Sequence, residues 1–377
     1  MSRDGGELTV LFAGGGTGGH LFPALAIAEQ VLEHAPKTSV KFLCSERPLD
    51  ASILRDEKLL GKPVNFEVIK AKPFVLRPLA FLRFLTSWGG AVRAGRREIQ
   101  QAKTRGSVWV VAGGGFVAAP VVQAARVERV PVLMLNLDAT PGLANRWISK
   151  RAKKIVTTAP VPGVNWESIP PIVRRAAIAP GDQAECRRRL GLDPSRPTIF
   201  ITGASQGAQS INQMMTALVK EHATELQRAQ WQIVHQTGKP DPSEIETAYR
   251  EAGLRASVFG FSKDLGVAWG AADFAVSRAG AGSVAEAWAN RVPTIFMPYP
   301  YHKDQHQKKN AEPLVAAGAA LLVDDRIDVV ANIAANGPLV LELARDGGKR
   351  ETIRTAMTKL GPANGAGRVA SMLLAGR

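Results

Sequence analysis

The sequence is short of several features that mark particular classes of protein. Its 377 residues include two cysteines, Cys44 and Cys186, which excludes a disulfide framework and favours a reduced, cytoplasmic compartment. There is no CxxC and no DxD, and the one HxxxH pair, His302 with His306, lacks the glutamate of the metalloprotease motif. We therefore expect no metal site. The first residues carry acids and glycines where a signal peptide needs a basic end and an apolar run, so no signal peptide is expected.

Long apolar runs are also scarce. One window, between Arg105 and Arg126, has no charge, but three glycines and a proline interrupt it. A membrane-spanning helix needs ~20 predominantly apolar residues, so we interpret this window as a strand at 108–112, a glycine loop and a helix. We expect no transmembrane segment. With 45% apolar and 21% charged residues, the composition is that of a globular protein of about two domains.

Acidic residues are few in the first half of the chain. Residues 1–160 hold 23 basic and 12 acidic residues, whereas residues 161–377 hold 25 and 21, so most of the net charge of +15 belongs to the first half. Such an excess suggests a polyanionic partner there, either nucleic acid or an anionic membrane. The alternative is an ordinary basic, solvated surface.

Short apolar strands alternate with helical stretches, which indicates an α/β fold with parallel sheets of βαβ units. A proline-rich patch at 159–163, with two more prolines at 170–171, predicts a linker. We place domains at 1–162 and 163–362, with a C-terminal helix at 363–377 that packs back on the first domain. The predicted strands lie at 8–13, 40–44, 64–69, 108–112, 132–137, 154–158, 198–202, 232–236, 257–259, 274–277, 294–297 and 320–323.

A glycine loop, GGGTGGH, follows the first predicted strand and opens a helix at about Leu21–His34. Glycines let backbone N–H groups approach a diphosphate at a helix N-terminus. The dinucleotide fingerprint is incomplete, because the acidic residue expected about 20 positions on is Glu46, 27 residues past Gly19. His20 abuts this loop and is a candidate catalytic base, against the alternative of a structural histidine.

The second loop, GASQG at 203–207, lies between a predicted strand and the helix at 208–219. Its GxSxG pattern is also that of the hydrolase nucleophile elbow, in which Ser205 would act with Asp273 and His302 or His306. No HGGG-type oxyanion segment precedes it, so we favour a loop whose amides and Ser205 hydroxyl bind phosphate.

The third loop, SRAGAGSVAEA, runs from a predicted strand into a helix that is expected to begin at about Ser283. Ser283 and Glu286 have the spacing of a capping box, which is the structural explanation for this pair. The functional alternative gives the free amides to a diphosphate and lets Glu286 accept hydrogen bonds from a ribose diol. The polar residues of 297–307 suit a hydroxyl-rich ligand, with a solvated helix start as the alternative.

A basic, amphipathic stretch covers residues 70–88. Residues 60–110 hold ten basic and two acidic residues, interleaved with large apolar side chains. This pattern is typical of an interfacial membrane contact, and the alternative is a core-facing helix with snorkelling arginines. Nucleic acid is not expected, because no recognised binding module occurs. The candidate membrane-contact residues are Phe74, Leu76, Arg77, Phe81, Leu82, Arg83, Leu85 and Trp88.

Seven separated segments, in order, resemble the MurG family: GGGTGGHLFPALAIA, VAGGGFV, PGLANRW, GASQGAQSIN, HQTG, SRAGAGSVAE and HKDQHQKKNA. The resemblance implies a GT-B fold, with two Rossmann-like domains facing each other across a cleft. It also implies an inverting hexosyltransferase that moves GlcNAc from UDP-GlcNAc to the 4-hydroxyl of undecaprenyl-diphosphate-linked MurNAc-pentapeptide, converting lipid I to lipid II. That reaction belongs to peptidoglycan synthesis and cell wall biogenesis, and so to cell shape and division.

The resemblance assigns roles to residues at matching positions. His20 would be the base for the acceptor hydroxyl, and UDP-GlcNAc would contact Thr17, Gly18, Gly19, Asp138, Arg174, Ser205, Ser262, Ala281, Gly282, Ser283, Val284, Ala285, Glu286 and Gln307. Four departures from the family pattern lie at Leu135–Asp138, Pro170–Pro171, Phe116 and Gly282. At the first of these, Asp138 replaces an asparagine that contacts the sugar, and an ionised carboxylate accepts but does not donate.

The expected mechanism is direct displacement, with the departing UDP stabilised by loop amides and helix N-termini and no cofactor required. The resemblance implies a peripheral protein on the cytoplasmic face of the inner membrane, with UDP-GlcNAc, lipid I and the anionic membrane surface as partners. Two alternatives stay open: a GT-B transferase with another UDP-sugar or acceptor, and a non-catalytic binding paralogue.

Overall fold

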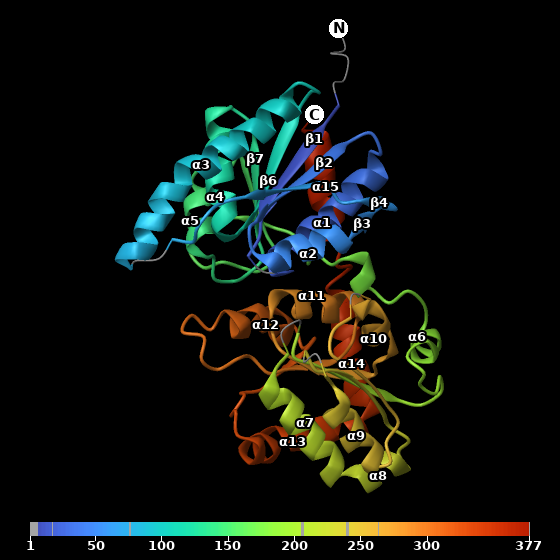
Figure 1. Ribbon diagram of the computed structural model, residues 1–377. Helices are drawn as coiled ribbons and strands as arrows, with labels where there is room; N and C mark the ends of the chain where they lie inside the picture. The colour runs from blue at the N-terminus through green and yellow to red at the C-terminus, as the bar shows by residue number, and fades with distance from the viewer. Residues whose placement is uncertain are drawn as a thin grey trace. The chain divides into compact units, whose positions relative to one another are not determined.

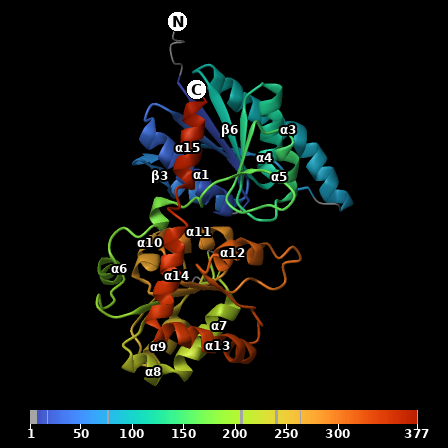
Figure 2. The ribbon, with the colours of Figure 1, turned by 180° about the vertical axis from the view of Figure 1, so that it is seen from behind.

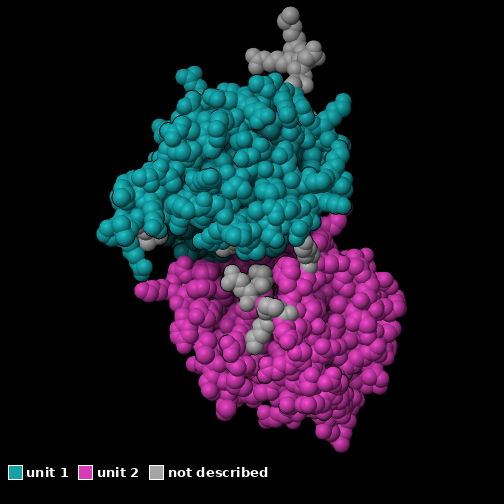
Figure 3. Space-filling view, viewed as in Figure 1, with its two compact units in different colours: residues 1–172, 364–377 teal, residues 173–363 magenta. Residues whose placement is uncertain are grey.

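The computed structural model describes residues 7–16, 18–74, 77–204, 207–238, 241–262 and 264–376. The chain divides into two compact units, shown in different colours in Figure 3. Unit 1 comprises residues 1–172 and 364–377, and unit 2 comprises residues 173–363. Each unit is built on its own parallel sheet, as the alternation of apolar strands and helices predicts.

The sheet of unit 1 has seven parallel strands in the order β5-β2-β1-β6-β7-β8-β9. The first strand lies near the centre, and the chain moves outward from it in both directions, which is the doubly wound arrangement. The strands are β1 (Thr9–Gly14), β2 (Ser39–Ser45), β5 (Phe66–Ile69), β6 (Val108–Gly114), β7 (Val132–Asn136), β8 (Lys154–Thr157) and β9 (Glu167–Ser168). A separate antiparallel hairpin joins β3 (Lys58–Leu59) to β4 (Lys62–Pro63).

Helices cover both faces of this sheet because alternate side chains of each strand point to opposite faces. In β1, Val10 and Phe12 pack with α1 and α15, whereas Leu11 and Ala13 pack with α3 and α4. The helices on the first face are α1 (Gly18–His34), α2 (Pro48–Asp56) and α15 (Gly365–Ala375). Those on the second face are α3 (Pro78–Lys103), α4 (Gly115–Val127) and α5 (Leu143–Ser149). Figures 1 and 2 show the two layers of helices, one on each face of the sheet.

The boundary between the units lies ten residues beyond the one placed from the sequence. The proline-rich patch at 159–163 belongs to unit 1, because β9 follows it and pairs with β8. Ile169 and Ile172 are buried in the core of unit 1, so the chain leaves this unit after Ile172. It returns at the C-terminus, where α15 lies alongside α1 (Figure 2) and the Gly365 amide donates to the Pro171 carbonyl.

The sheet of unit 2 has six parallel strands in the order β12-β11-β10-β13-β14-β15. They are β10 (Thr198–Thr202), β11 (Gln232–Gln236), β12 (Ala256–Phe259), β13 (Phe274–Ser277), β14 (Thr294–Phe296) and β15 (Leu321–Leu322). The helical segments are η1 (Arg175–Ala177), α6 (Gln183–Arg189), α7 (Gln209–Glu221), α8 (Ala223–Arg228), α9 (Ser243–Glu251), α10 (Leu265–Ala271), α11 (Ala281–Asn290), α12 (His306–Ala316), α13 (Val329–Arg345) and α14 (Gly347–Lys359).

In doubly wound sheets ligands bind at the carboxyl ends of the strands, where loops lead into helix N-termini. The carboxyl ends of β1, β6 and β7 in unit 1 and of β10 and β13 in unit 2 therefore mark where to look for a site. The interrupted apolar window at 106–125 forms β6 and α4, which confirms the predicted strand and helix, but its glycines end the strand and begin the helix and form no separate loop. Within the described ranges, no helix is long and apolar enough to cross a membrane.

Candidate functional site

Two glycine loops pack against each other at the carboxyl ends of β1 and β6. The first leads from Gly14, the last residue of β1, to α1, which begins at Gly18. The second is the tight junction of β6 with α4 at Gly114 and Gly115, with φ of +100° and +76°. A Cβ on Gly115 would lie 2.4 Å from the carbonyl oxygen of Gly15, so the two loops approach too closely for any side chain there. The glycines are required by this contact as well as by backbone conformation.

His20 lies in the first turn of α1 and is half-buried beside the second glycine loop. A Cβ on Gly114 would be 3.1 Å from His20 Cε1, so the imidazole fills the space that the glycine leaves. Burial lowers the pKa of His20 below its ordinary value, while the charge of Asp138, the backbone of Gly113 and the charge of Asp50 act in the opposite direction. The imidazole is therefore mainly neutral near pH 7, which is the form that accepts a proton.

Asp138 follows β7 and is held through its backbone by buried amides. The Asn136 side-chain amide donates to the Asp138 carbonyl at 2.7 Å and to Thr157 Oγ1 at 3.0 Å. Asn145 Nδ2 in turn donates to Asn136 Oδ1 at 3.2 Å. This network brings the predicted residues His20 and Asp138 near one another, as the effect of the Asp138 charge on the imidazole shows.

A second acidic residue, Asp50, supports the first glycine loop and was not predicted from the sequence. It is fully buried in the first turn of α2, and its Oδ2 accepts from the Gly16 amide at 2.7 Å and from Ser45 Oγ at 2.5 Å. Arg47 Nη1 donates to the Gly16 carbonyl at 2.5 Å. The signal available in the sequence was the run of polar residues directly after the strand at 40–44.

In unit 2, Glu286 lies on α11 with its carboxylate bonded to a tryptophan. Trp269 Nε1 donates to Glu286 Oε2 at 3.0 Å. Burial raises the pKa of Glu286 to about 7, while the Trp269 hydrogen bond and the positive charge of Arg174 pull it down. Predicted residues Arg174 and Glu286 are thus close enough to interact, and Trp269 is a further member of the site that the sequence pattern did not reveal.

The capping box, which was the structural alternative for Ser283 and Glu286, does not form. Helix α11 begins two residues earlier, at Ala281, with Gly280 as its N-cap and no side-chain cap hydrogen bond. Glu286 turns instead toward Trp269 on α10. The helix starts on small residues whose N–H groups no side-chain cap occupies, which is the arrangement that binds anions at helix N-termini. Gly282 is exposed at this end, whereas Ser283, Val284 and Ala285 are buried.

Two other predicted residues lie in unit 2, one at the start of a helix and one in a loop. Gln307, in the first turn of α12, accepts from the Tyr299 amide at 2.9 Å through Oε1, so it holds the loop that precedes the helix. Ser262 follows β12, and its hydroxyl accepts from the Asp264 amide at 3.1 Å. In the part of the chain that the structure describes, no three His, Cys, Asp or Glu side chains gather as a metal site would require.

Three predicted residues, Thr17, Leu76 and Ser205, lie outside the described residues. The position of Asp273, which the hydrolase alternative also names, does not favour that alternative. This residue comes directly before β13, and its Oδ2 accepts from the Thr198 amide, at the beginning of β10, at 2.7 Å. A five-residue strand spans roughly 16 Å, so Asp273 lies at the amino-terminal end of this sheet and far from the carboxyl end of β10, where ligands bind in doubly wound sheets.

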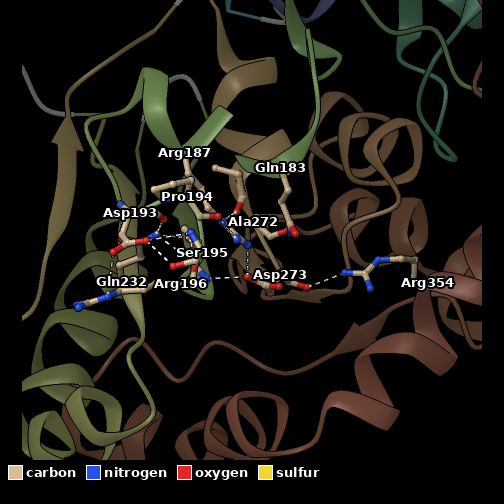
Figure 4. Close-up of polar contacts among 12 residues, drawn as sticks. Gln183, Arg187, Asp193, Pro194, Ser195, Arg196, Gln232, Ala272, Asp273 and Arg354 are labelled. Atoms are coloured by element: carbon tan, nitrogen blue, oxygen red, sulfur yellow. Dashed lines mark hydrogen bonds and ion pairs between the residues drawn. The ribbon is translucent and has the colours of Figure 1, made fainter. Parts of the chain in front are cut away.

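Figure 4 shows what Asp273 does instead. Arg187 Nη2 donates to Asp273 Oδ2 at 2.7 Å, and Arg187 also donates to the carbonyls of Ala271 and Pro194. Gln232 ties the adjoining turn to β11 by donating to the carbonyls of Asp193 and Arg196. This cluster fastens α6 to the amino-terminal edge of the sheet of unit 2.

We therefore expect Asp273→Ala to destabilise the protein without changing the chemistry. Removing one partner of the largely buried pair leaves Arg187 without its counter-charge, for an expected loss of about 2–3 kcal/mol of unfolding free energy. Glu225→Gln, which breaks the exposed pair with Arg345, should cost under about 1 kcal/mol. Urea denaturation measures both. A folded Asp273→Ala protein that has lost all turnover would instead favour a catalytic role.

The candidate membrane-contact residues that the structure describes lie in or just before the N-terminal half of α3, whose light blue end projects beyond neighbouring helices in Figures 1 and 2. Leu79, Leu82 and Leu85 are 75%, 58% and 51% exposed and follow one another at helical spacing. Phe74, Arg77, Phe81 and Arg83 are also exposed, whereas Trp88 is half-buried.

The other side of this helix carries the aromatic rings. Phe84 contacts Phe74 and Trp88, with ring centroids 5.3 and 5.5 Å apart, and Trp88 contacts Trp147 on α5 at 5.9 Å. In the C-terminal half of α3, Ala91, Ile99 and Ala102 are buried in the core of unit 1. The core-facing alternative therefore describes the C-terminal half of the helix, and the leucines of the N-terminal half remain exposed.

Comparison with known proteins agrees with this architecture. Residues 10–157 match the glycosyltransferase family 28 N-terminal domain, and residues 198–335 match the glycosyltransferase family 28 C-terminal domain. A crystal structure of MurG from Acinetobacter baumannii is similar, with a TM-score of 0.72 and 24% identity over 98% of this chain and 99% of that one. The two doubly wound units thus form a GT-B glycosyltransferase fold, as predicted.

The similarity extends to relatives with assigned activities. UDP-N-acetylglucosamine--N-acetylmuramyl-(pentapeptide) pyrophosphoryl-undecaprenol N-acetylglucosamine transferase of Anaeromyxobacter dehalogenans is 31% identical over 97% of this chain and 92% of its own length. The protein of the same description from Streptomyces coelicolor is 33% identical over 84% of each. The chain belongs to glycosyltransferase family 28.

Proposed function

We propose that the protein transfers N-acetylglucosamine from UDP-GlcNAc to undecaprenyl-diphosphate-linked N-acetylmuramoyl-pentapeptide, as the descriptions of its relatives state for those proteins. The observation that carries the proposal is the 31% identity over 97% of the chain. The geometry supports it, because each unit offers part of the chemistry that a sugar transfer needs. Unit 1 has a mainly neutral imidazole beside glycine loops, and unit 2 has an uncapped helix N-terminus beside the half-buried Glu286.

The proposed reaction is a direct displacement with inversion at the anomeric carbon. His20 takes the proton of the acceptor 4-hydroxyl while the hydroxyl oxygen forms a bond to the anomeric carbon. At the same time the bond between the anomeric carbon and the UDP oxygen breaks. The charge that develops on UDP is stabilised by the amides at the start of α11 and by Arg174. Glu286 accepts hydrogen bonds from the ribose diol. We propose no cofactor for this chemistry.

We further propose that the N-terminal half of α3 seats the enzyme on the cytoplasmic face of a membrane, where a lipid-linked acceptor is available. Exposed leucines would enter the acyl boundary, and Arg77 and Arg83 would meet anionic headgroups. The excess of basic residues in the first half of the sequence adds long-range attraction to the same surface. We assign no nucleic-acid partner.

The double variant Leu82→Ser/Leu85→Ser should weaken binding to vesicles that contain anionic lipid by about 100-fold or more, because each buried leucine contributes about 1.5–3 kcal/mol. Co-sedimentation at two salt concentrations measures this, and binding of the wild-type protein should fall as salt rises. Val127→Ser, at the end of α4, removes another exposed apolar side chain of unit 1 and serves as the control. Binding that ignores both salt and the leucines would contradict the proposal.

The function itself is tested with radiolabelled UDP-GlcNAc, other UDP-sugars and lipid I in vesicles, without added metal. Labelled lipid II is the expected product. Transfer from a different UDP-sugar would favour a different donor. Binding of UDP-GlcNAc without transfer to lipid I would favour a different acceptor or a non-catalytic role. Absence of UDP-sugar binding would contradict the assignment of the site in unit 2.

A further inference from the structure

Asp50 is a fully buried carboxylate that the proposed chemistry does not use. It lies in the first turn of α2, where the helix dipole favours a negative charge. Its Oδ2 accepts from the Gly16 amide at 2.7 Å, the Ser45 amide at 3.2 Å and Ser45 Oγ at 2.5 Å. One carboxylate oxygen therefore joins the loop after β1 to the end of β2.

This carboxylate shapes the glycine loop that leads into α1. A Cβ on Gly15 would lie 2.3 Å from Asp50 Oδ2, so the carboxylate occupies the space that any side chain at this position would need. Gly16 has φ of +96°, its amide is bound by Asp50, and its carbonyl is bound by Arg47 Nη1 at 2.5 Å. Both polar backbone groups of Gly16 are thus fixed by side chains from the region after β2.

The charge of Asp50 also acts on His20. The groups that act on the imidazole come from three elements: Asp138 from the loop after β7, the backbone of Gly113 in β6 and Asp50 from α2. All three favour the protonated ring, and burial opposes them. Arg47 is the cation of this cluster, and its guanidinium lies on the Gly16 carbonyl and 5.4 Å from the ring centroid of Phe116. A fixed charge in a buried site interacts more strongly than one in water.

We propose that Asp50 is a positioning residue for His20: it fixes the glycine loop from which α1 begins and stabilises the imidazolium that forms when His20 takes the acceptor's proton. The inference rests on the proposed function, because it makes Asp50 act through His20 as the base. This role explains why a buried carboxylate packs against a loop whose glycine positions leave no room for a side chain.

The direct test uses NMR to monitor the titration of His20 in protein labelled at its six histidines. The His20→Asn variant identifies which signal belongs to His20. Asp50→Asn keeps the size of the side chain and removes its charge. We expect the midpoint of His20 to fall by between a few tenths and about one pH unit. Glu167→Gln removes an exposed acid of unit 1 from β9, four strands along the sheet from β1, and should leave the midpoint unchanged. An unchanged midpoint in Asp50→Asn overturns the proposal.

Turnover gives the second readout. Asp50→Asn should lower kcat by about tenfold, leave the KM for UDP-GlcNAc unchanged and move the acid limb of the kcat/KM profile to lower pH, in step with the NMR midpoint. The NMR titration needs no substrate, so the two proposals fail separately. If the wild-type protein transfers no sugar, only the proposed function is contradicted. If the wild-type protein transfers sugar normally but the His20 midpoint is unchanged in Asp50→Asn, only the role of Asp50 is contradicted.

Ser45→Ala keeps the test open if Asp50→Asn does not fold. It removes one donor from Oδ2 and keeps the charge, so the His20 midpoint should stay within about 0.2 pH unit of wild type while exchange of the Gly16 amide becomes several-fold faster. Unchanged exchange of the Gly16 amide in this variant would show that the carboxylate does not hold the loop, and would overturn the proposal.

Discussion

Replacing His20 by alanine should lower kcat by about 10²- to 10⁴-fold, the usual contribution of a positioned general base, and leave the KM for UDP-GlcNAc nearly unchanged. The reason is that the acceptor hydroxyl loses its proton acceptor while the donor site of unit 2 is untouched. In the wild-type enzyme, kcat/KM should rise with pH through a midpoint below 6.5, because burial lowers the pKa of His20 and the neutral form is the active one. This acid limb should be absent from the residual activity of His20→Ala.

His34→Ala is the matched control for this experiment. His34 ends the same helix, is exposed, and makes one hydrogen bond through Nδ1 with the Gln30 carbonyl. Its loss should leave kcat and the pH profile unchanged. Near-full turnover of His20→Ala at saturating substrates would mean that another group takes the proton.

Replacing Glu286 by glutamine should weaken UDP-GlcNAc binding by about 10- to 100-fold, because hydrogen bonds to a charged group contribute about 1.5–3 kcal/mol. The wild-type affinity should also depend on pH. The pKa of Glu286 is raised to about 7, and a diol binds the ionised form, so binding requires loss of a proton at lower pH. Affinity should therefore fall by up to about 15-fold from pH 7 to pH 5.5, because Glu286 is about half ionised at pH 7 and the ionised fraction then falls almost tenfold for each further pH unit.

Calorimetric titration with UDP-GlcNAc measures both effects, because its doubly esterified diphosphate does not titrate in this range. The pH dependence should vanish in Glu286→Gln and persist in Glu312→Gln, which removes an exposed acid of α12. The raised pKa means that the folded state holds its proton longer than the unfolded chain, so this group costs stability as pH rises from about 4.5 to about 7. Glu286→Gln should thus be at least as stable as wild type at pH 8, and a lower Tm there would point to misfolding rather than a lost contact.

Most of the fold is predictable from sequence because its strands are buried on both faces. Such strands are near-continuous apolar runs, and those at 198–202, 232–236 and 274–277 were predicted with the observed bounds. The strand β9, Glu167–Ser168, was missed because two polar residues at a sheet edge carry no apolar pattern. That omission also explains the shift of the boundary between the units, because the prolines before β9 were interpreted as the linker.

The candidate site was predictable only where local spacing determines it. The glycine loop and His20 are adjacent in the sequence, so the local pattern of a strand, a glycine loop and a helix start is enough to predict both. The partners of these residues come from elsewhere in the chain: Asp50 lies 34 residues from Gly16, and Trp269 lies 17 residues from Glu286. Such pairs depend on how whole elements pack. The capping-box alternative is excluded for the same reason, since Glu286 makes a tertiary contact with Trp269 in place of a local hydrogen bond.

The return of the chain to unit 1 through α15 has a consequence for biosynthesis. Unit 1 is encoded in two pieces, with residues 173–363 inserted between them. At typical ribosomal speeds of about 5–20 residues per second, this insertion takes roughly 10–40 s to make. During that time the face of the sheet that receives α15 has its strands and α1 but lacks its last helix. Unit 2 is encoded without interruption, so its core can form before translation ends. The core of unit 1 can be completed only after α15 has been synthesised.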